Sequence, residues 1–224
     1  MAEWGLCSTI RAPADQVLAF VAHHLSLGAD HLWLFFDDPD DPAADAVSGI
    51  AEVTVTRCDH AYWQATCKTR PELHQNRQTR NIHRVYKTAA LPWIGHIDVD
   101  EFLLPARPIA EILGEVRADR ITVRIAPWEA LHDPSLPADI FTARHFRAAI
   151  NGRGNLKYAA RTGIERGFDG QRAQVGVGAD QFVGQRGAAL QFAHRRLGNP
   201  QRAQLRHQVI AGHHGNLQRH TLLG

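Results

Sequence analysis

The chain has 224 residues, 44% of them apolar, which is enough to bury the core of at least one globular domain. Its formal charge of +2, from 25 basic and 23 acidic residues, argues against a dedicated nucleic-acid-binding protein. Three cysteines without short spacing indicate neither a disulfide framework nor a zinc site of the CxxC type. No apolar run reaches membrane-spanning length and no signal peptide is evident, so we expect a cytoplasmic protein for which peripheral membrane association stays open.

The first hundred residues alternate between predicted strands and helices. Apolar or alternating runs predict four strands, at Trp4 to Ile10, His31 to Phe36, Ala51 to Arg57 and Trp93 to Ile97. An apolar stripe at helical spacing predicts a helix from Pro13 to Gly28, in which the pair His23-His24 is interpreted as a packing feature. This order predicts an α/β fold with a mostly parallel central sheet flanked by helices.

A second helix is predicted before the fourth strand. Thr69 and Glu72 have capping-box spacing, so the helix is expected to begin there. Its C-terminal half carries an apolar stripe that includes Val85, but the same face is polar earlier, at Gln78 and Asn81. Either the start of this helix is solvated, or its polar face lines a cleft.

The second half of the chain is less regular. We expect a helix from Pro108 to Val116, a strand from Arg120 to Ala126, a loop over PWEALHDPSLP, strands within DIFTARHFRAA and NLKYAAR, and a helix from Asn199 to Gly212. No internal repeat or linker is evident, so residues 1–224 are interpreted as one domain.

Two of the predicted strands end in acidic clusters. Asp37 and Asp38 follow the second strand, and Asp98, Asp100 and Glu101 follow the fourth. Because ligands bind at the carboxyl ends of parallel strands, both clusters are expected at the ligand edge of the sheet. Asp98 and Asp100 point to the same side if strand geometry persists, and two carboxylates can share Mn²⁺ or Mg²⁺ with phosphate oxygens. The simpler alternative is an acidic turn without a ligand.

The stretch WIGHIDVDEFLLP, from Trp93 to Pro105, resembles the metal-binding motif of family-2-like bacterial glycosyltransferases with the GT-A fold, in the subgroup with a D-x-D-E-F motif. The stretches FVAHHLSLGADHLWLFFDDPDD and RPELHQNRQTRNIHRVYKTAALPWIGHIDVDEF resemble the same subgroup. The resemblance covers Leu6 to about Phe146. It implies metal-dependent, inverting transfer of a sugar from a nucleotide-diphosphate donor, expected to be UDP-linked, to a hydroxyl of a glycan or other acceptor.

The resemblance also implies roles for residues of the first half. Asp37 is expected to contact the nucleotide, and Asp98 and Asp100 to bind the metal, with Asp98 also contacting the ribose or diphosphate. Gln78, on the polar helix face, is expected to line the same cleft. Residues 1–105 are thus the expected nucleotide- and metal-binding half, and residues 106–224 the acceptor-side half with a C-terminal extension.

Further roles fall on the second half. Lys157 and Arg161 are the expected phosphate contacts. A late histidine often completes the metal shell in the family, and His194 is the first candidate, with His207 and His213 as rivals. An inverting reaction also needs a carboxylate that takes the proton of the acceptor. The candidates for this base are Glu129, Asp133 and Asp180.

Two other functions stay open. The Asn-Glu pair that follows the first strand in the family is absent, because Arg11-Ala12-Pro13-Ala14 stands there. A catalytically silent GT-A-like protein that binds a nucleotide or glycan is therefore one alternative. A metal-dependent nucleotidyl or phosphoryl transferase is another, because such enzymes also use paired aspartates. No nucleic-acid partner is expected.

Overall fold

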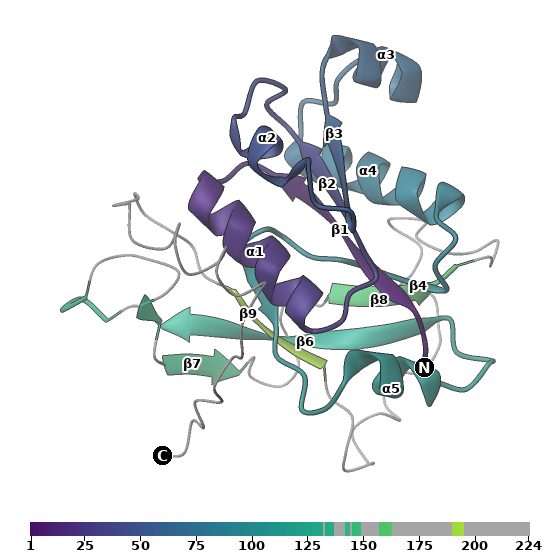
Figure 1. Ribbon diagram of the computed structural model, residues 1–224, viewed down its shortest axis with the longest axis vertical. Helices are drawn as coiled ribbons and strands as arrows, with labels where there is room; N and C mark the ends of the chain where they lie inside the picture. Colours follow the sequence, from purple (N-terminus) through teal and green to yellow (C-terminus); the bar gives the residue numbers. More distant parts are fainter. Residues whose placement is uncertain (132, 137–141, 144, 149–156, 163–189, 195–224) are drawn as a thin grey trace.

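The structure is a computed structural model that describes residues 1–131, 133–136, 142–143, 145–148, 157–162 and 190–194 (Figure 1). The first half contains the strands β1 (Trp4–Ile10), β2 (His31–Phe36), β3 (Val53–Arg57), β4 (Trp93–His96) and β5 (Glu101–Leu103). The helices are α1 (Ala14–Ser26), α2 (Ala43–Val47), α3 (His60–Cys67), α4 (His74–Thr88) and α5 (Ile109–Gly114). The later strands are β6 (Thr122–Leu131), β7 (His145–Ala148), β8 (Lys157–Arg161) and β9 (Leu190–His194).

The strands form one sheet in the order β3-β2-β1-β4-β8-β6-β9-β5, with β7 paired to β6. The first four strands in this order are mutually parallel. β8 is antiparallel to both β4 and β6, so β6 runs in the same direction as β4, and β9 is parallel to β6. The predicted α/β fold with a mostly parallel central sheet is therefore confirmed.

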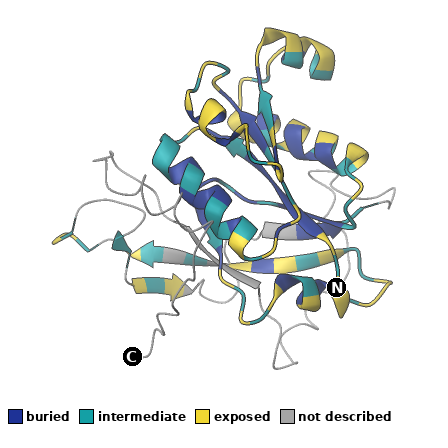
Figure 2. Ribbon diagram, in the orientation of Figure 1, coloured by how far each residue is buried: buried dark blue, intermediate teal, exposed yellow. Residues whose placement is uncertain are grey.

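Helices cover both faces of the parallel part of the sheet (Figure 1). On one face, α1, α2 and α5 pack on a core that includes Phe20 and Phe36. On the other face, α3 and α4 pack on a smaller core through Trp63, Ile82 and Val85. The run from Leu32 to Phe36 is therefore apolar throughout because β2 has helices on both sides. Figure 2 shows the resulting concentration of buried residues on β1 and β2.

The predicted elements of the first half are present with small shifts at their ends. α1 is followed by Gly28 at φ 83°, a conformation that favours glycine, so the predicted stop is confirmed. α4 begins at His74 rather than at Thr69, and no side chain caps it. The short helices α2 and α3 were not predicted. α3 does carry a local signal, because the Asp59 side chain accepts a hydrogen bond from the N–H of Tyr62 at its start.

The predicted loop PWEALHDPSLP is wrong in its first half, because β6 continues to Leu131. Pro127 is tolerated there because it lies at the point where the strand paired with β6 on one side changes from β8 to β7. β8 pairs with β6 as far as Ile125, and β7 pairs from Trp128 onward. Among the described residues, one side of the strand has no ladder partner at Pro127, so the missing N–H costs no hydrogen bond to them on that side. The helix predicted from Asn199 to Gly212 lies outside the described residues.

Within the described part of the chain, no helix combines the length and the apolar character needed to cross a bilayer.

Gly5 is a position where the packing of β1 against β2 excludes any side chain. A Cβ atom at Gly5 would lie 2.5 Å from the carbonyl oxygen of His31 and 2.7 Å from the ring of Trp33. We expect Gly5→Ala to lower the free energy of unfolding by about 1–3 kcal/mol, because backbone must move to admit the methyl group. Urea denaturation measures this loss. Gly49→Ala is the matched control, because a Cβ there meets nothing within 4 Å, and equal stability of the two variants would contradict the prediction.

Candidate functional site

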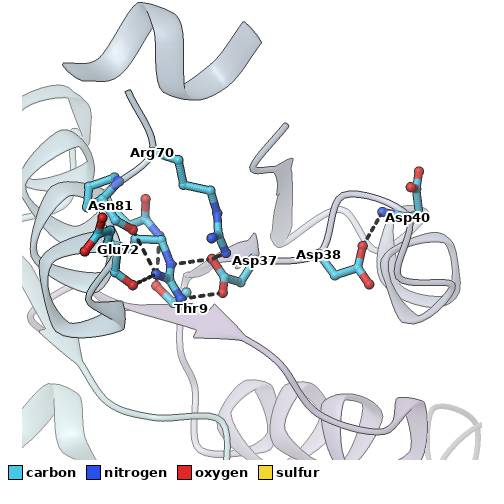
Figure 3. A network of polar contacts seen from close by, with 9 residues as sticks. Thr9, Asp37, Asp38, Asp40, Arg70, Glu72 and Asn81 are labelled. Carbon is cyan, nitrogen blue, oxygen red and sulfur yellow. Dashed lines mark hydrogen bonds and ion pairs between the residues drawn. The ribbon is translucent and has the colours of Figure 1, made fainter. Parts of the chain in front are cut away.

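The carboxyl end of β2 carries a buried ion pair that ties the end of this strand to α4 (Figure 3). The guanidinium of Arg77 on α4 donates to both carboxylate oxygens of Asp37, from Nε to Oδ1 at 2.7 Å and from Nη2 to Oδ2 at 2.9 Å. Both side chains are only 6% exposed. Arg70 approaches the same carboxylate, with Nη2 at 2.9 Å from Oδ1, but its side chain is 47% exposed. Asp37 is thus buried against two cations.

Arg77 also determines how the chain enters α4. Its Nη1 donates to the carbonyl oxygens of Pro71 and Glu72, at 2.9 and 2.6 Å. These carbonyls therefore point to Arg77, and residues 69–73 wrap around its guanidinium. This is the physical reason why α4 begins after Leu73 and why the capping box expected at Thr69 does not form. The wrapped segment also brings Arg70 to Asp37.

The next residues along α4 reach two further strand ends. Gln78 donates from Nε2 to Oδ1 of Asp98 at 2.5 Å, in the turn after β4. Asn81, fully buried, donates to the hydroxyl of Thr9 on β1 at 2.8 Å and accepts a hydrogen bond from Tyr62 on α3. The polar face of α4 therefore contacts the carboxyl ends of β1, β2 and β4, and its expected role as the wall of a cleft stays a prediction. Arg77 lies on that face too.

The D-x-D-E-F stretch folds into a tight turn between β4 and β5. The side chain of Glu101, 2% exposed, accepts the backbone N–H of Asp98 at 2.8 Å. The backbone N–H of Glu101 in turn donates to the carbonyl of Asp98 at 3.0 Å. Glu101 therefore braces the turn, while Asp98 and Asp100 are half-buried within it. Leu103 then returns to the core, but Leu104 is 45% exposed.

The two adjacent histidines of α1 hold the strand that follows this turn. His24 accepts the backbone N–H of Leu103 on its Nε2 at 3.3 Å, and its Nδ1 lies 2.8 Å from the carbonyl of Phe20. His23 places its Nε2 2.8 Å from the carbonyl of Leu103. Both polar backbone groups of Leu103 are thus satisfied by imidazoles, so the pair has the packing role predicted for it. Burial, with repulsion from His23, lowers the pKa of His24 to about 3, which keeps it neutral.

A pocket of about 660 Å³ opens beside the ion pair, at the carboxyl ends of β1, β2 and β3. Its walls include Trp63 and Cys58, and burial, with repulsion from Asp37, raises the pKa of the Cys58 thiol to about 12. Three cationic side chains also line it: Arg11, Lys68 and Arg70. The pocket therefore combines an aromatic residue and a neutral thiol with positive charge. Nothing in the spacing of these residues along the sequence identified it.

Register places three later candidates beside the D-x-D-E-F turn. Glu101 pairs with His194 of β9, and His194 pairs with Glu129 of β6. Three adjacent strands thus bring Glu101, His194 and Glu129 into one row, with neighbouring backbones about 5 Å apart. β8 begins at Lys157, two residues before Ala159, which pairs with Gly95. Lys157 therefore lies at the end of β4 from which Asp98 follows.

Two other predicted residues have different surroundings. Arg161 pairs with Trp93, the first residue of β4, and its guanidinium lies 4.5 Å from the centre of the Trp93 ring. Five residues of extended chain separate Trp93 from Asp98, roughly 16 Å, so this position does not fit the expected phosphate contact. Asp133 follows β6 and accepts hydrogen bonds on Oδ1 from the backbone and hydroxyl of Ser135. Asp180, His207 and His213 lie outside the described residues.

Whether Mg²⁺ or Mn²⁺ fits this site depends on how many ligating side chains lie together. Among the described residues, no three histidine, cysteine, aspartate or glutamate side chains are grouped as a metal cage requires. Asp98 and Asp100 supply two carboxylates, and Mg²⁺ or Mn²⁺ in phosphate-binding sites is held by one or two carboxylates together with the phosphates of the substrate. The residues present therefore fit a cation shared with a ligand, and the metal stays a prediction.

Comparisons with known proteins add a fold likeness only. No protein-family model matches the sequence, and no curated protein matches it. One solved structure, a CMP:2-keto-3-deoxy-manno-octonic acid synthetase complexed with CTP, has 16% identity and a TM-score of 0.37 over 71% of this chain and 74% of its own. HddC from Yersinia pseudotuberculosis has 11% identity and a TM-score of 0.41 over 88% and 92%. At TM-scores below 0.5, these likenesses indicate no substrate for this chain.

The Asp37–Arg77 pair predicts a large effect of a single substitution. Arg77→Met removes the bidentate partner of a buried carboxylate, and we expect the free energy of unfolding to fall by about 3–5 kcal/mol, because breaking one side of a buried pair leaves its charge poorly compensated. Chemical denaturation measures the loss. Arg117→Met removes an exposed pair with Asp119 and is the control. A loss no larger than that of the control would contradict the assignment.

The histidine pair predicts a pH dependence of stability. The pKa of His24 is about 3 in the folded chain against 6.5 in the unfolded chain, so its contribution is complete above pH 6.5 and is lost as the pH falls towards 3. We expect His24 to account for about 2 kcal/mol of the fall in unfolding free energy between pH 7 and pH 5. Denaturation at both pH values measures it. His24→Gln should show a shallower fall and His74→Gln an unchanged one, and identical slopes in all three proteins would refute the role of His24.

Proposed function

We propose that this protein is a metal-dependent glycosyltransferase that moves a sugar from a nucleotide-diphosphate donor to an acceptor hydroxyl. The observation that carries the proposal is the bridge made by α4. Its consecutive residues Arg77 and Gln78 tie the pocket at Asp37 to the paired acids at Asp98. A pocket and an acid pair at one sheet edge suit the two ends of a nucleotide diphosphate, a planar base and a charged diphosphate.

Each part of the site has a separate task in this reaction. The pocket holds the nucleoside, and Asp98 and Asp100 hold the cation together with the ribose and diphosphate of the donor. When bound there, Mn²⁺ or Mg²⁺ neutralises the negative charge that builds up on the leaving diphosphate. Gln78 orients the carboxylate of Asp98, and Glu101 fixes the backbone of the same residue. Lys157, at the same end of the sheet, adds a second positive charge for the phosphates.

The acceptor hydroxyl must lose a proton as its oxygen attacks the sugar, so an inverting enzyme places a carboxylate near that oxygen. Glu129 is the candidate that shares a register row with Glu101. Asp133 lies two residues beyond the end of β6, and one of its carboxylate oxygens already accepts hydrogen bonds from Ser135. We therefore assign the base to Glu129, with Asp133 as the second candidate.

Glu129→Gln should abolish sugar transfer without weakening donor binding.

The proposal predicts metal-dependent nucleotide binding. With UDP at about 100 times its Kd and Mn²⁺ present, the protein should gain about 2.7 kcal/mol of stability by linkage, visible as a raised Tm. Asp100→Asn should remove the part of this gain that depends on Mn²⁺, and Asp119→Asn, at an exposed ion pair, should keep it.

Turnover of the donor separates a transferase from a silent binder. Wild-type protein should slowly release UDP from a UDP-sugar, and Asp100→Asn should not. Failure of every nucleoside diphosphate to raise the Tm with Mn²⁺ would overturn the proposal. Release of pyrophosphate from a nucleoside triphosphate and a sugar phosphate would replace it with nucleotidyl transfer.

A further inference from the structure

The solvent-facing side of α4 carries positive charge without an acidic side chain. The helix, HQNRQTRNIHRVYKT, contains three arginines and one lysine but no aspartate or glutamate. Arg77 is buried on Asp37, whereas Arg80, Arg84 and Lys87 are exposed. Spaced by four and three residues, these three side chains lie on one side of the helix. α3, which packs on the same face of the sheet, has no acidic residue within it either, and Figure 2 shows that both helices expose residues to solvent.

These positive charges have no acidic partner among the described residues. Arg107 and Arg117 each form a salt bridge with an acid, but within the part of the chain that the structure describes no salt bridge reaches Arg80, Arg84 or Lys87. Arg80 and Arg84 are four residues apart, and like charges at that spacing destabilise a helix. A surface that serves solubility alone interleaves charges of both signs. Charge of a single sign on this helix therefore suits an anionic partner.

A large apolar side chain lies in line with these cations. Leu73, the N-cap residue of α4, is 62% exposed, more than any other large apolar side chain of the described chain except Met1. It precedes the three exposed cations by seven, eleven and fourteen residues, so at 3.6 residues per turn the four positions lie within about 40° of one line, about 21 Å long. An apolar layer that covered Leu73 would stabilise the complex by removing it from water. The following four residues form the basic stripe of α4: Leu73, Arg80, Arg84 and Lys87.

Charge is also separated between the two faces of the sheet. The segment from Asp38 to Glu52, which contains α2, has five acidic residues and no lysine or arginine, and one of the five, Asp45, pairs with Arg57. α2 packs on the opposite face of the sheet from α4. The net charge of only +2 therefore conceals a basic side and an acidic side. An extended anionic surface attracts the first and repels the second, so it orients the molecule with α4 towards it.

We propose that the basic stripe docks this protein on an anionic membrane surface. Its three cations contact lipid phosphates, and Leu73 enters the boundary between the headgroups and the acyl chains. A bilayer fits these observations better than a nucleic acid does, because the stripe holds no aromatic residue on which a base could stack, and a phosphate backbone offers no apolar layer to Leu73. The proposal is independent of the transfer reaction, because it uses neither the pocket nor the acids of the D-x-D-E-F turn.

The test is sedimentation of the full chain with lipid vesicles at about 0.1 M salt, where the Debye length is about 10 Å. One set of vesicles holds equal parts of phosphatidylcholine and phosphatidylglycerol, and the other holds phosphatidylcholine alone. A cation near an anionic bilayer contributes about fivefold in affinity, so the three cations of the stripe should give the anionic vesicles a preference of about a hundredfold. At about 1 M salt the Debye length falls to about 3 Å, and this preference should disappear.

Three variants locate the docking surface. Arg80→Gln combined with Lys87→Gln should bind anionic vesicles about 25-fold more weakly than the wild type. Arg107→Gln combined with Arg117→Gln removes the same total charge beside α5, on the opposite face of the sheet, and should bind as the wild type does. Leu73→Ser should lower the affinity about tenfold, the lower end of what burial of a leucine contributes. Because serine is a preferred N-cap residue, that loss would not come from a weakened α4.

The outcomes that contradict the proposal are distinct. Equal binding to both kinds of vesicle would overturn it, and so would an equal loss in the two double variants, because total charge rather than α4 would then be responsible. Tighter binding to a short DNA duplex than to anionic vesicles would overturn it in favour of a nucleic acid. An unchanged affinity of Leu73→Ser would refute the insertion of Leu73. If the double variant on α4 does not fold, Lys87→Gln alone should lower the affinity about fivefold, and an unchanged affinity would refute the docking surface.

Discussion

The polar edge of the sheet, at the carboxyl ends of β1, β2 and β4, depends on one buried ion pair, between Asp37 at the end of β2 and Arg77 on α4. Two charges that leave water this completely need near-ideal geometry, and the bidentate contact supplies it. The same guanidinium binds the carbonyls of Pro71 and Glu72, so it also sets where α4 begins. From the same helix, Gln78 reaches Asp98, and Asn81 reaches Thr9 and Tyr62. Three polar positions of this face thus connect α4 to three strand ends.

A second set of contacts keeps the acidic turn in place from the opposite face of the sheet. Glu101 holds the backbone of Asp98, and two residues later His23 and His24 hold both polar groups of Leu103. Asp98 and Asp100 lie two residues apart in one turn, and like charges that come near each other repel, so these contacts support a turn that carries both. α1 and α4 therefore act on the same turn from two sides of the sheet. This is how a sequence can place three acids between two buried segments without losing the core on either side.

The sequence predicted much of this, and its errors have identifiable causes. Strong apolar patterns located β1, α1, β2 and β4, because burial on one or both faces leaves a clear period. α4 begins later than Thr69 because Arg77, which is held by the distant Asp37, binds the carbonyls of Pro71 and Glu72 and overrides the local capping preference. β6 extends through Pro127 because its neighbours change at that residue, which no local pattern reveals. The pairing of Asp37 with Arg77 was not predicted, because no linear pattern links residues 40 positions apart.

By itself, the sequence determined the α/β class, the position of the acids at strand ends and their presence on one edge of the sheet, because these follow from hydrophobic periodicity and the parallel direction of β1 to β4. Only the tertiary structure decided what each polar side chain does there. It assigned Asp37 to a buried pair, Glu101 and the two histidines to the support of the turn, and Arg161 to the far end of β4. It also brought Glu101, His194 and Glu129 into one row. The physical reason is that hydrophobic periodicity indicates only whether a residue is buried. Which side chain a charged residue pairs with depends on which distant segments lie beside it in the folded chain.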